Sequence, residues 1–198
     1  QKAIIKECRL QGKFCIVATE MLESMKKNSR PTRAEVSDIA NAVINGTDAV
    51  MLSGETTTGK FPSETVKYMA DICEEAEKHL DYSINKNTII DDVSEAIAAS
   101  VVDTSNLLDA KLIVAATMSG KTARLISNLR PRSLILASTP SEKVARGLAL
   151  NAGVYPVITK EYESTDEIVN DSIVRAKDFT DIVKDDLLII TGGFPNNA

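Results

Sequence analysis

Residues 111–139 read KLIVAATMSGKTARLISNLRPRSLILAST, and this stretch decides the fold class. Leu112–Ala116 and Ser133–Ala137 are continuous apolar runs of strand length, and Lys121–Leu129 between them has apolar residues at helical spacing. A strand, a helix and a second strand in this order predict two parallel strands joined by a right-handed crossover. The stretch therefore predicts an α/β fold with a parallel sheet.

The same alternation of helices and strands continues on both sides of this unit. It predicts a three-layer αβα domain with a mainly parallel sheet, because helices that connect parallel strands cover the faces of the sheet. The further expected helices are Asp92–Leu108, Ser141–Leu150 and Thr165–Ile182, and the further expected strands are Val154–Ile158 and Leu187–Thr191.

A polar stretch, Tyr82–Asn87, precedes this domain and is typical of a linker. We place the boundary near residue 83, which gives segments 1–82 and 83–198. The first segment begins without a Met and contains only two strand-like runs, which can neither bury both faces of a sheet nor close a barrel. We therefore expect it to be an incomplete domain of a longer protein, whose uncovered strand edges lead either to self-association or to disorder of this segment. Its expected strands are Phe14–Ala18 and Ala49–Leu52, and its expected helices are Lys2–Leu10, Glu20–Lys26, Ala34–Asn45 and Ser63–Leu80.

The composition is that of a folded globular protein: 43% of the 198 residues are hydrophobic and 26% are charged. The net charge of −5 gives no overall basic excess that would favour nucleic acid or an anionic membrane. Cys8, Cys15 and Cys73 lack CxxC spacing, which favours free thiols in a reducing compartment over disulfides or a zinc site. No apolar run approaches the roughly 18–20 residues of a membrane span, so we expect a cytoplasmic protein.

Positive charge is nevertheless concentrated around the helix of the quoted stretch. Residues 120–146 contain a single acid, Glu142, and six basic residues: Lys121, Arg124, Arg130, Arg132, Lys143 and Arg146. The loop Thr117–Thr122 lies between a strand and this helix, where backbone N–H groups and the helix dipole can bind an anion. The candidate phosphate-binding residues are Thr117, Ser119, Gly120, Lys121 and Thr122.

Two other interpretations of this loop stay open at the level of sequence. Ser119 could be an ordinary helix N-cap, with Gly120 supplying the turn geometry. A P-loop nucleotide hydrolase would need the pattern GxxxxGK[ST], but Ala115 stands at the position of its first glycine. Ligands of open parallel sheets lie beyond the carboxyl ends of the strands, so Gly192–Pro195 is either a second wall of the site or a simple turn.

Two strand ends of the first segment carry hydroxyl and carboxylate groups. Thr19 follows the first strand-like run, and Ser53 and Glu55 follow the second. If these strands belong to a βα barrel, both loops lie on the face that carries the chemistry, and a hydroxyl beside a carboxylate can relay a proton. Ser53 and Glu55 could equally be the cap and the first-turn acid of a helix.

Several long stretches resemble pyruvate kinases in the right order and spacing. In the first segment they are KFCIVATEMLESM (13–25), RPTRAEVSDIANAV (30–43) and DAVMLSGETTTG (48–59). In the second segment ATMSGKTARLISNLRP (116–131) resembles the effector loop and helix of that family, and DLLIITGG (186–193) resembles its penultimate strand. The resemblance spans essentially the whole chain.

The resemblance implies that residues 1–82 are the last part of a catalytic (β/α)8 TIM barrel. It implies that residues 83–198 are most of a C-terminal allosteric domain that lacks its final strand. Pyruvate kinases are cytoplasmic glycolytic enzymes, commonly tetramers, that transfer a phosphoryl group from phosphoenolpyruvate to ADP and give pyruvate and ATP. They use Mg²⁺ and usually K⁺.

The resemblance also implies roles for individual residues. Thr19 matches a substrate-contacting threonine, and Ser53 and Glu55 match a proposed proton relay, so these three are the candidate catalytic residues. Thr117, Ser119, Gly120, Lys121 and Thr122 match the loop that holds a phosphate of a sugar-phosphate or nucleotide activator. Arg30 and Arg33 match a segment near the subunit interface of the tetramer.

The chain also departs from the family. The phosphoryl-stabilising lysine, the metal-binding glutamate and aspartate, and the domain that covers ADP have no match here, so we expect no metal ligands and no activity from this chain alone. Glu20 stands where most members have glutamine. The alternative functions are a stand-alone sensor of phosphorylated metabolites and, with less support, a P-loop-like NTPase.

Overall fold

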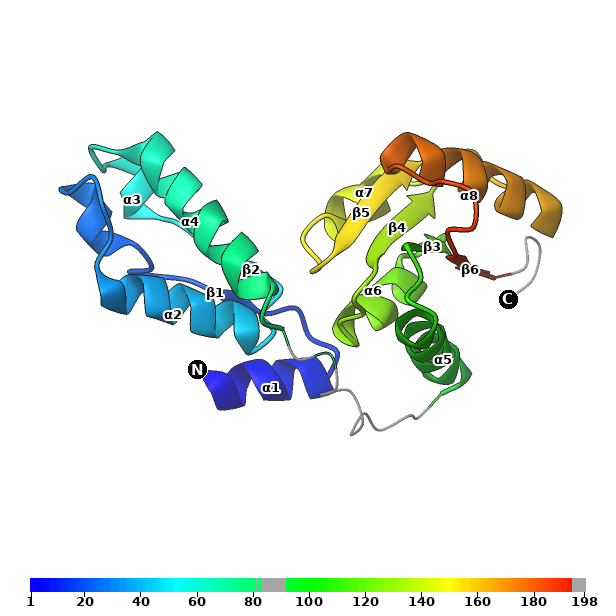
Figure 1. Ribbon diagram of the computed structural model, residues 1–198, viewed down its shortest axis with the longest axis horizontal. Coiled ribbons are helices and arrows are strands. Elements are labelled where there is room, and N and C mark those ends of the chain that lie inside the picture. Colours follow the sequence, from blue (N-terminus) through cyan, green and yellow to red (C-terminus); the bar gives the residue numbers. More distant parts are fainter. Residues whose placement is uncertain (81, 83–91, 194–198) are drawn as a thin grey trace. The chain divides into compact units, whose positions relative to one another are not determined.

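The computed structural model describes residues 1–80, 82 and 92–193 (Figure 1). The chain divides into two compact units, Gln1–Ile84 and Asn85–Ala198. Of the stretch expected to be a linker, Tyr82–Asn87, only Tyr82 lies within the described residues, and the expected turn Gly192–Pro195 is described only as far as Gly193.

The first unit contains a small parallel sheet of two strands, β1 and β2, with Ile16 opposite Ala49 and Val17 opposite Val50. The order of elements agrees with the sequence analysis except for a short helix, Gly54–Thr57, in which Ser53 is the N-cap residue and Glu55 the first-turn acid, as their alternative interpretation held. In chain order the elements are α1 (Lys2–Leu10), β1 (Ile16–Val17), the 3-10 helix η1 (Glu23–Lys26), α2 (Arg33–Ile44), β2 (Ala49–Val50), α3 (Gly54–Thr57) and α4 (Pro62–Glu77).

Two expectations for the first unit were wrong in extent. Both strands are shorter than expected: β1 begins two residues later, at Ile16, and β2 ends two residues earlier, at Val50. Before β1, side chains join the backbone in binding Cys15: Asp48 Oδ2 accepts from the Cys15 N–H at 2.9 Å, and Thr47 Oγ1 donates to the Cys15 carbonyl at 2.9 Å. The expected helix Glu20–Lys26 is only the short helix η1. Thr19 and Glu20 have φ of 72° and 55°, in the left-handed region, so no right-handed helix can begin there.

Local sequence signals explain the two long helices that form the core of this unit. Thr32 and Glu35 form a capping box at the start of α2, and Pro62 occupies the first turn of α4, where its missing N–H costs nothing. The apolar faces of these helices pack with residues of η1 and of the loop before it. The buried cluster consists of Met21, Leu22, Met25, Ile39, Met69 and Ile72.

The second unit is built on a four-stranded parallel sheet with the order β5-β4-β3-β6. Helix α8 ends before the expected Ile182, because Thr180 has an extended backbone. The elements are α5 (Val93–Leu107), β3 (Leu112–Ala116), α6 (Lys121–Asn128), β4 (Leu134–Thr139), α7 (Glu142–Leu148), β5 (Val154–Ile158), α8 (Thr165–Phe179) and β6 (Leu188–Gly192).

Helices cover both faces of this sheet, with α8 on one face and α5 and α6 on the other (Figure 1). Strand β3 is central and fully buried, and its side chains alternate between the two hydrophobic clusters. Ile113 and Ala115 pack against the face of α5, α6 and α7, whereas Leu112 and Val114 pack against the face of α8. These layers confirm the α/β fold class.

The order of strands reverses next to β3. The chain runs from β3 to β4 and β5 and then returns to place β6 on the other side of β3, with Ala116 opposite Gly192. Ligands of open parallel sheets bind beyond the carboxyl ends of the strands at such a reversal. The loop Thr117–Gly120, which follows β3, occupies this position.

Candidate functional site

The loop after β3 is folded by hydrogen bonds to its own side chains. Thr117 is buried, and its Oγ1 accepts from the Gly120 N–H at 2.9 Å, while the Thr117 N–H donates to the Ser138 carbonyl at 2.9 Å. Ser119 Oγ accepts from the Lys121 N–H at 3.3 Å. The expected N-cap by Ser119 is therefore wrong: the N-cap residue of α6 is Gly120, which has no side-chain cap hydrogen bond, and Ser119 Oγ reaches only the first N–H of the helix.

Gly120 is required by its conformation and by its surroundings. Its φ is +81°, in the left-handed region. A Cβ at this position would lie 2.8 Å from Arg124 Nη1, 3.1 Å from Val144 Cγ1 and 3.2 Å from Leu148 Cδ2. A side chain would therefore disturb both the loop and the packing of α6 against α7.

Two basic side chains of α6 lie at this loop. Lys121 Nζ forms an ion pair with Asp92 Oδ2 at 2.8 Å and contacts Ser94 Oγ at 3.4 Å. Arg124 Nη2 donates to the Ser119 carbonyl at 2.8 Å. Lys121 and Arg124 are exposed and Thr122 is half-buried, so the positive charge of the loop is accessible to a ligand.

Asp92 is a residue of this site that the sequence analysis identified only as a helix start. It is the N-cap of α5, where its Oδ1 accepts from the Glu95 N–H at 2.8 Å. The hydrogen bond from Lys121, together with that from the Glu95 N–H, lowers the pKa of the Asp92 carboxyl. Because Asp92 and Lys121 are far apart in the sequence, no local pattern could have revealed the pair.

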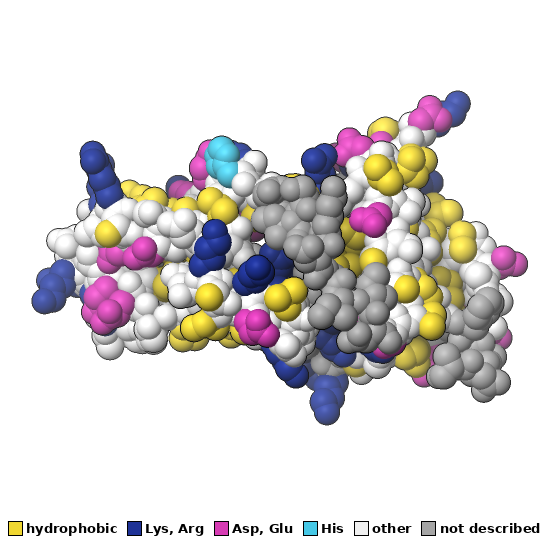
Figure 2. All heavy atoms as spheres, turned by 90° about the horizontal axis from the view of Figure 1, so that it is seen from below, with side chains coloured by type: hydrophobic (Ala, Val, Ile, Leu, Met, Phe, Trp, Pro, Cys, Tyr) yellow, Lys and Arg dark blue, Asp and Glu magenta, His cyan; other side chains and the backbone are white. Residues whose placement is uncertain are grey.

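The basic residues of segment 120–146 do not all gather at the loop. Arg146 pairs with Glu142 at 3.0 Å on the exposed surface of α7, and Arg130 donates to the Ser127 carbonyl at 2.9 Å. On the face shown in Figure 2, Lys and Arg side chains are scattered, and Asp and Glu side chains occur among them. Lys121 and Arg124 are therefore the two cations that the described contacts connect to the loop.

The candidate catalytic residues of the first unit lie at the ends of its two adjacent strands. Thr19 follows β1 and Ser53 follows β2, and both are exposed. Glu55 is 1% exposed and accepts from the Leu22 N–H at 3.2 Å and from the Ser53 N–H at 2.8 Å. The structure thus connects both strand ends through one buried carboxylate.

The ionisation of Glu55 is set by opposing effects. Burial raises its pKa, but hydrogen bonds from its own N–H and from the N–H groups of Ser53 and Leu22, with the charge of Lys26, outweigh burial and lower the pKa below 4.5. The ionised carboxylate is a hydrogen-bond acceptor only. In this geometry Glu55 holds the two loops together rather than offering a proton.

A second carboxylate network, around the half-buried Glu35, was not identified as part of a site from the sequence. Glu35 accepts from the Ser24 N–H and hydroxyl at 2.7 and 2.6 Å, and from the Thr32 N–H and hydroxyl at 2.7 and 2.8 Å. The capping-box pattern Thr32-x-x-Glu35 is the signal that could have found half of it. Arg30 and Arg33 lie exposed beside this network, at the start of α2.

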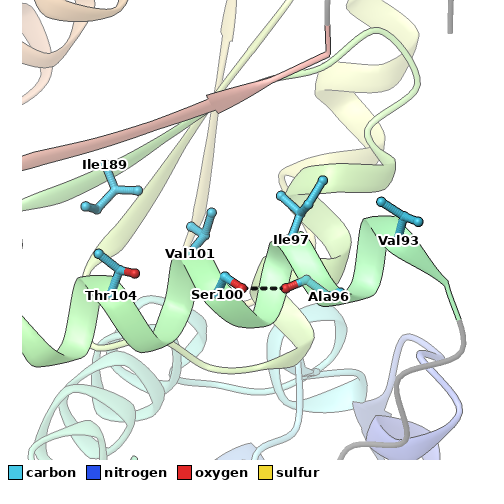
Figure 3. A pocket seen from close by; sticks show the side chains of 7 residues that line it. All are labelled: Val93, Ala96, Ile97, Ser100, Val101, Thr104 and Ile189. Carbon is cyan, nitrogen blue, oxygen red and sulfur yellow. Dashed lines mark hydrogen bonds between the residues drawn. The ribbon is translucent and has the colours of Figure 1, made fainter.

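An apolar groove of about 380 Å³ lies between α5 and β6. Ile189 of β6 closes one side, and Val93, Ile97 and Val101 line the helix side (Figure 3). Ser100 Oγ donates to the Ala96 carbonyl at 2.9 Å, so its hydroxyl is already used. The lining residues include no charged side chain, so the groove does not suit an anion.

The part of the chain that the structure describes shows no group of three or more His, Cys, Asp or Glu side chains that could hold a metal ion. Its three cysteines are free thiols. None of the described helices is both long enough and apolar enough to cross a membrane.

Two family models match this chain. The model for "Pyruvate kinase, barrel domain" matches residues 1–66, and the model for "Pyruvate kinase, alpha/beta domain" matches residues 95–198. The chain belongs to the pyruvate kinase family. The resemblance seen in the sequence is thereby confirmed, and the two parallel sheets are the end of a pyruvate kinase barrel domain and its α/β domain.

Relatives and solved structures support the same assignment. The chain is 45% identical to a pyruvate kinase of Clostridium acetobutylicum over 202 residues, which is 100% of this chain and 43% of that protein. It is 49% identical to a pyruvate kinase of Staphylococcus haemolyticus, covering 98% of this chain and 34% of that protein. A crystal structure of a pyruvate kinase from Cryptosporidium parvum matches with a TM-score of 0.91 and 41% identity, covering 97% of this chain and 40% of that one.

A structure of the Cryptosporidium parvum enzyme in complex with ADP also matches, with a TM-score of 0.88 and 40% identity. This chain spans less than half the length of the curated relatives that it matches. It is therefore similar to a part of each pyruvate kinase.

Proposed function

We propose that the second unit binds the phosphate of an allosteric effector at Thr117–Thr122, within a pyruvate kinase that transfers a phosphoryl group from phosphoenolpyruvate to ADP. In this proposal residues 1–82 belong to the catalytic barrel, and residues 83–198 form the allosteric domain. The observation that carries it is the placement of Lys121 and Arg124 in the first turns of α6, directly after the left-handed Gly120 and beyond strand β3, where the strand order reverses.

The chemistry of the loop suits a phosphate monoester. The Lys121 ammonium and the Arg124 guanidinium supply positive charge, and the hydroxyls of Ser119 and Thr122 can donate to phosphate oxygens. The N-terminus of α6 adds the positive end of its dipole at the same point. A sugar phosphate or a nucleotide is therefore the expected effector class.

At the barrel end, we propose that Thr19 and Ser53 contact the substrate from neighbouring strand ends. Glu55 would orient both loops through the Leu22 and Ser53 N–H groups. In a proton relay through Ser53, the role of Glu55 would be to position the serine by accepting a hydrogen bond from its backbone N–H.

Pyruvate kinases in general depend on a divalent metal and on K⁺. Among residues 1–80, 82 and 92–193, no three His, Cys, Asp or Glu side chains come together at a point that could hold a metal ion. We propose that the ligands for Mg²⁺ and K⁺ belong to other parts of the whole enzyme. We also propose that this enzyme is cytoplasmic and a tetramer, with Arg30 and Arg33 near a subunit interface.

Calorimetric titration of the chain with fructose 1,6-bisphosphate, AMP and ribose 5-phosphate tests the effector site. We expect one of these to bind, and Lys121→Ala to weaken its binding by about tenfold or more. The matched control is Lys177→Ala, which removes an exposed lysine from the last turn of α8 and should leave the affinity unchanged. Failure of all three ligands to bind would contradict the effector site.

A separate assay tests whether this chain alone can catalyse the phosphoryl transfer that we propose for the whole enzyme. Phosphoryl transfer needs cations that neutralise the developing charge. We therefore expect no pyruvate from phosphoenolpyruvate and ADP with this chain alone, in the presence of Mg²⁺ and K⁺. Measurable pyruvate formation would overturn this expectation.

A further inference from the structure

Asp92 places its two carboxylate oxygens in two different interactions. Oδ1 caps α5 by accepting from the Glu95 N–H at 2.8 Å. Oδ2 pairs with Lys121 Nζ at 2.8 Å, and Ser94 Oγ lies 3.4 Å from the same nitrogen. The helix cap therefore holds a negative charge against the lysine of the effector loop.

Three acceptors of the loop are also engaged within the protein. Ser119 Oγ accepts from the Lys121 N–H, the Ser119 carbonyl accepts from Arg124, and Thr117 Oγ1 accepts from the Gly120 N–H. Such contacts are expected of an anion site whose binding groups are occupied by other groups of the same protein. The carboxylate of Asp92 stands where an anionic ligand of Lys121 would otherwise be.

Charge and exposure make this contact displaceable. The Lys121 and Asp92 side chains are 55% and 45% exposed, and such surface pairs are weak and screened by salt. A phosphate monoester carries more negative charge than a carboxylate and offers three acceptor oxygens, so it can replace Asp92 at Lys121. While Asp92 remains at Lys121, it both occupies the cation and repels the incoming phosphate.

We propose that Asp92 is a built-in competitor of the effector phosphate, which lowers the affinity of the loop and selects for ligands that carry a full phosphate charge. The inference rests on the proposed effector site. When phosphate takes Lys121, Asp92 keeps its bond to the Glu95 N–H and loses its ion pair. The start of α5 therefore loses its ion pair to Lys121 when the site is filled.

The decisive variant is Asp92→Asn, because asparagine caps a helix as well as aspartate but carries no charge. We expect fructose 1,6-bisphosphate, or whichever of AMP and ribose 5-phosphate binds the wild type, to bind this variant about three- to tenfold more tightly in low salt. The matched control is Glu142→Gln, which removes the one acid within residues 120–146 but faces Arg146 instead of Lys121. The affinity of the Glu142→Gln variant for the same ligand should stay within about twofold of that of the wild type.

Three outcomes would overturn the inference. If the wild type binds, Lys121→Ala does not, and Asp92→Asn binds no more tightly than the wild type, the effector site stands and the competitor role fails. If Glu142→Gln tightens binding as much as Asp92→Asn, the effect is one of general charge and the role again fails. If neither the wild type nor Asp92→Asn binds any of the three ligands, the proposed effector site fails and the inference fails with it.

A second measurement does not depend on comparing affinities. The carboxyl carbon of Asp92, followed by NMR at fixed pH, should shift when the wild-type chain is saturated with ligand, because the ion pair to Lys121 is lost. The carboxyl carbon of Glu142 should not shift. An unchanged Asp92 signal at saturation would contradict displacement.

Discussion

Glu55 accepts a hydrogen bond from the backbone N–H of Leu22 at 3.2 Å, although 33 positions separate the two residues. Leu22 is fully buried in the loop after β1, and Glu55 is buried just beyond β2. The second carboxylate oxygen accepts from the Ser53 N–H. One side chain thus supplies the connection between the two strand ends that carry Thr19 and Ser53.

This connection predicts a large effect of removing the carboxylate. Glu55→Ala would leave the buried Leu22 N–H without its partner and should lower the free energy of unfolding by about 2–4 kcal/mol, as measured by urea denaturation. Glu55→Gln keeps an acceptor oxygen and should cost less. The matched control, Glu74→Ala on the exposed face of α4, should change stability by less than about 0.5 kcal/mol. Equal effects of the two alanine variants would refute the connection.

The network around Glu35 predicts a specific dependence on pH. Burial raises the pKa of Glu35, but hydrogen bonds from Ser24 and Thr32 outweigh it and lower the pKa below 4.5. A carboxyl whose pKa is lower in the folded state stabilises the protein above the unfolded value of 4.5, and this stabilisation is lost as the pH falls through the folded value. Urea midpoints between about pH 3 and 7 should fall less steeply with acid for Glu35→Gln than for the wild type. Parallel curves would exclude a contribution from Glu35.

Two glycines of the second unit should respond to alanine in opposite directions. Gly120→Ala forces a side chain into the left-handed region and against Arg124, and should destabilise the protein by about 1–3 kcal/mol. Gly147 lies in α7, and no neighbouring atom comes within 4 Å of the place that a Cβ would take, so Gly147→Ala should stabilise the protein by about 0.5–1 kcal/mol. Thermal unfolding of the two variants tests the contrast, which fails if both change stability in the same direction.

The hydroxyl of Thr117 should protect a single backbone amide. Its Oγ1 is the acceptor for the buried Gly120 N–H, so Thr117→Val should speed hydrogen exchange at Gly120 and cost about 1–2 kcal/mol of stability. Thr117→Ser keeps the acceptor and is the control. Unchanged exchange at Gly120 in the valine variant would show that the hydroxyl does not hold the loop.

The elements predicted most closely were those that depend on residues near one another in the sequence. The apolar run Leu112–Ala116 gave the bounds of β3, and the helical spacing after Gly120 gave α6 to within a residue. Predicted boundaries were wrong where the backbone conformation or side-chain contacts outweigh helix or strand propensity. An example is the left-handed conformation of Thr19, before η1.

The candidate loop Thr117–Thr122 was predictable for a similar reason, since its glycine, hydroxyls and lysine are consecutive. The contact of the loop with a distant segment was not predictable. Asp92 reaches Lys121, and Glu55 reaches Leu22, only because the fold brings distant segments together. No periodicity or spacing encodes such pairs.

The position of β3 between β4 and β6 also has a consequence for biosynthesis. During translation β3 can pair with β4 as soon as the short α6 connection has been made, but its other edge must wait for Leu188–Gly192. Until then an apolar strand exposes unpaired N–H and C=O groups, a state prone to mispairing with other chains. Slow elongation or a premature stop between β5 and β6 should therefore favour aggregation of the nascent chain through the open edge of β3.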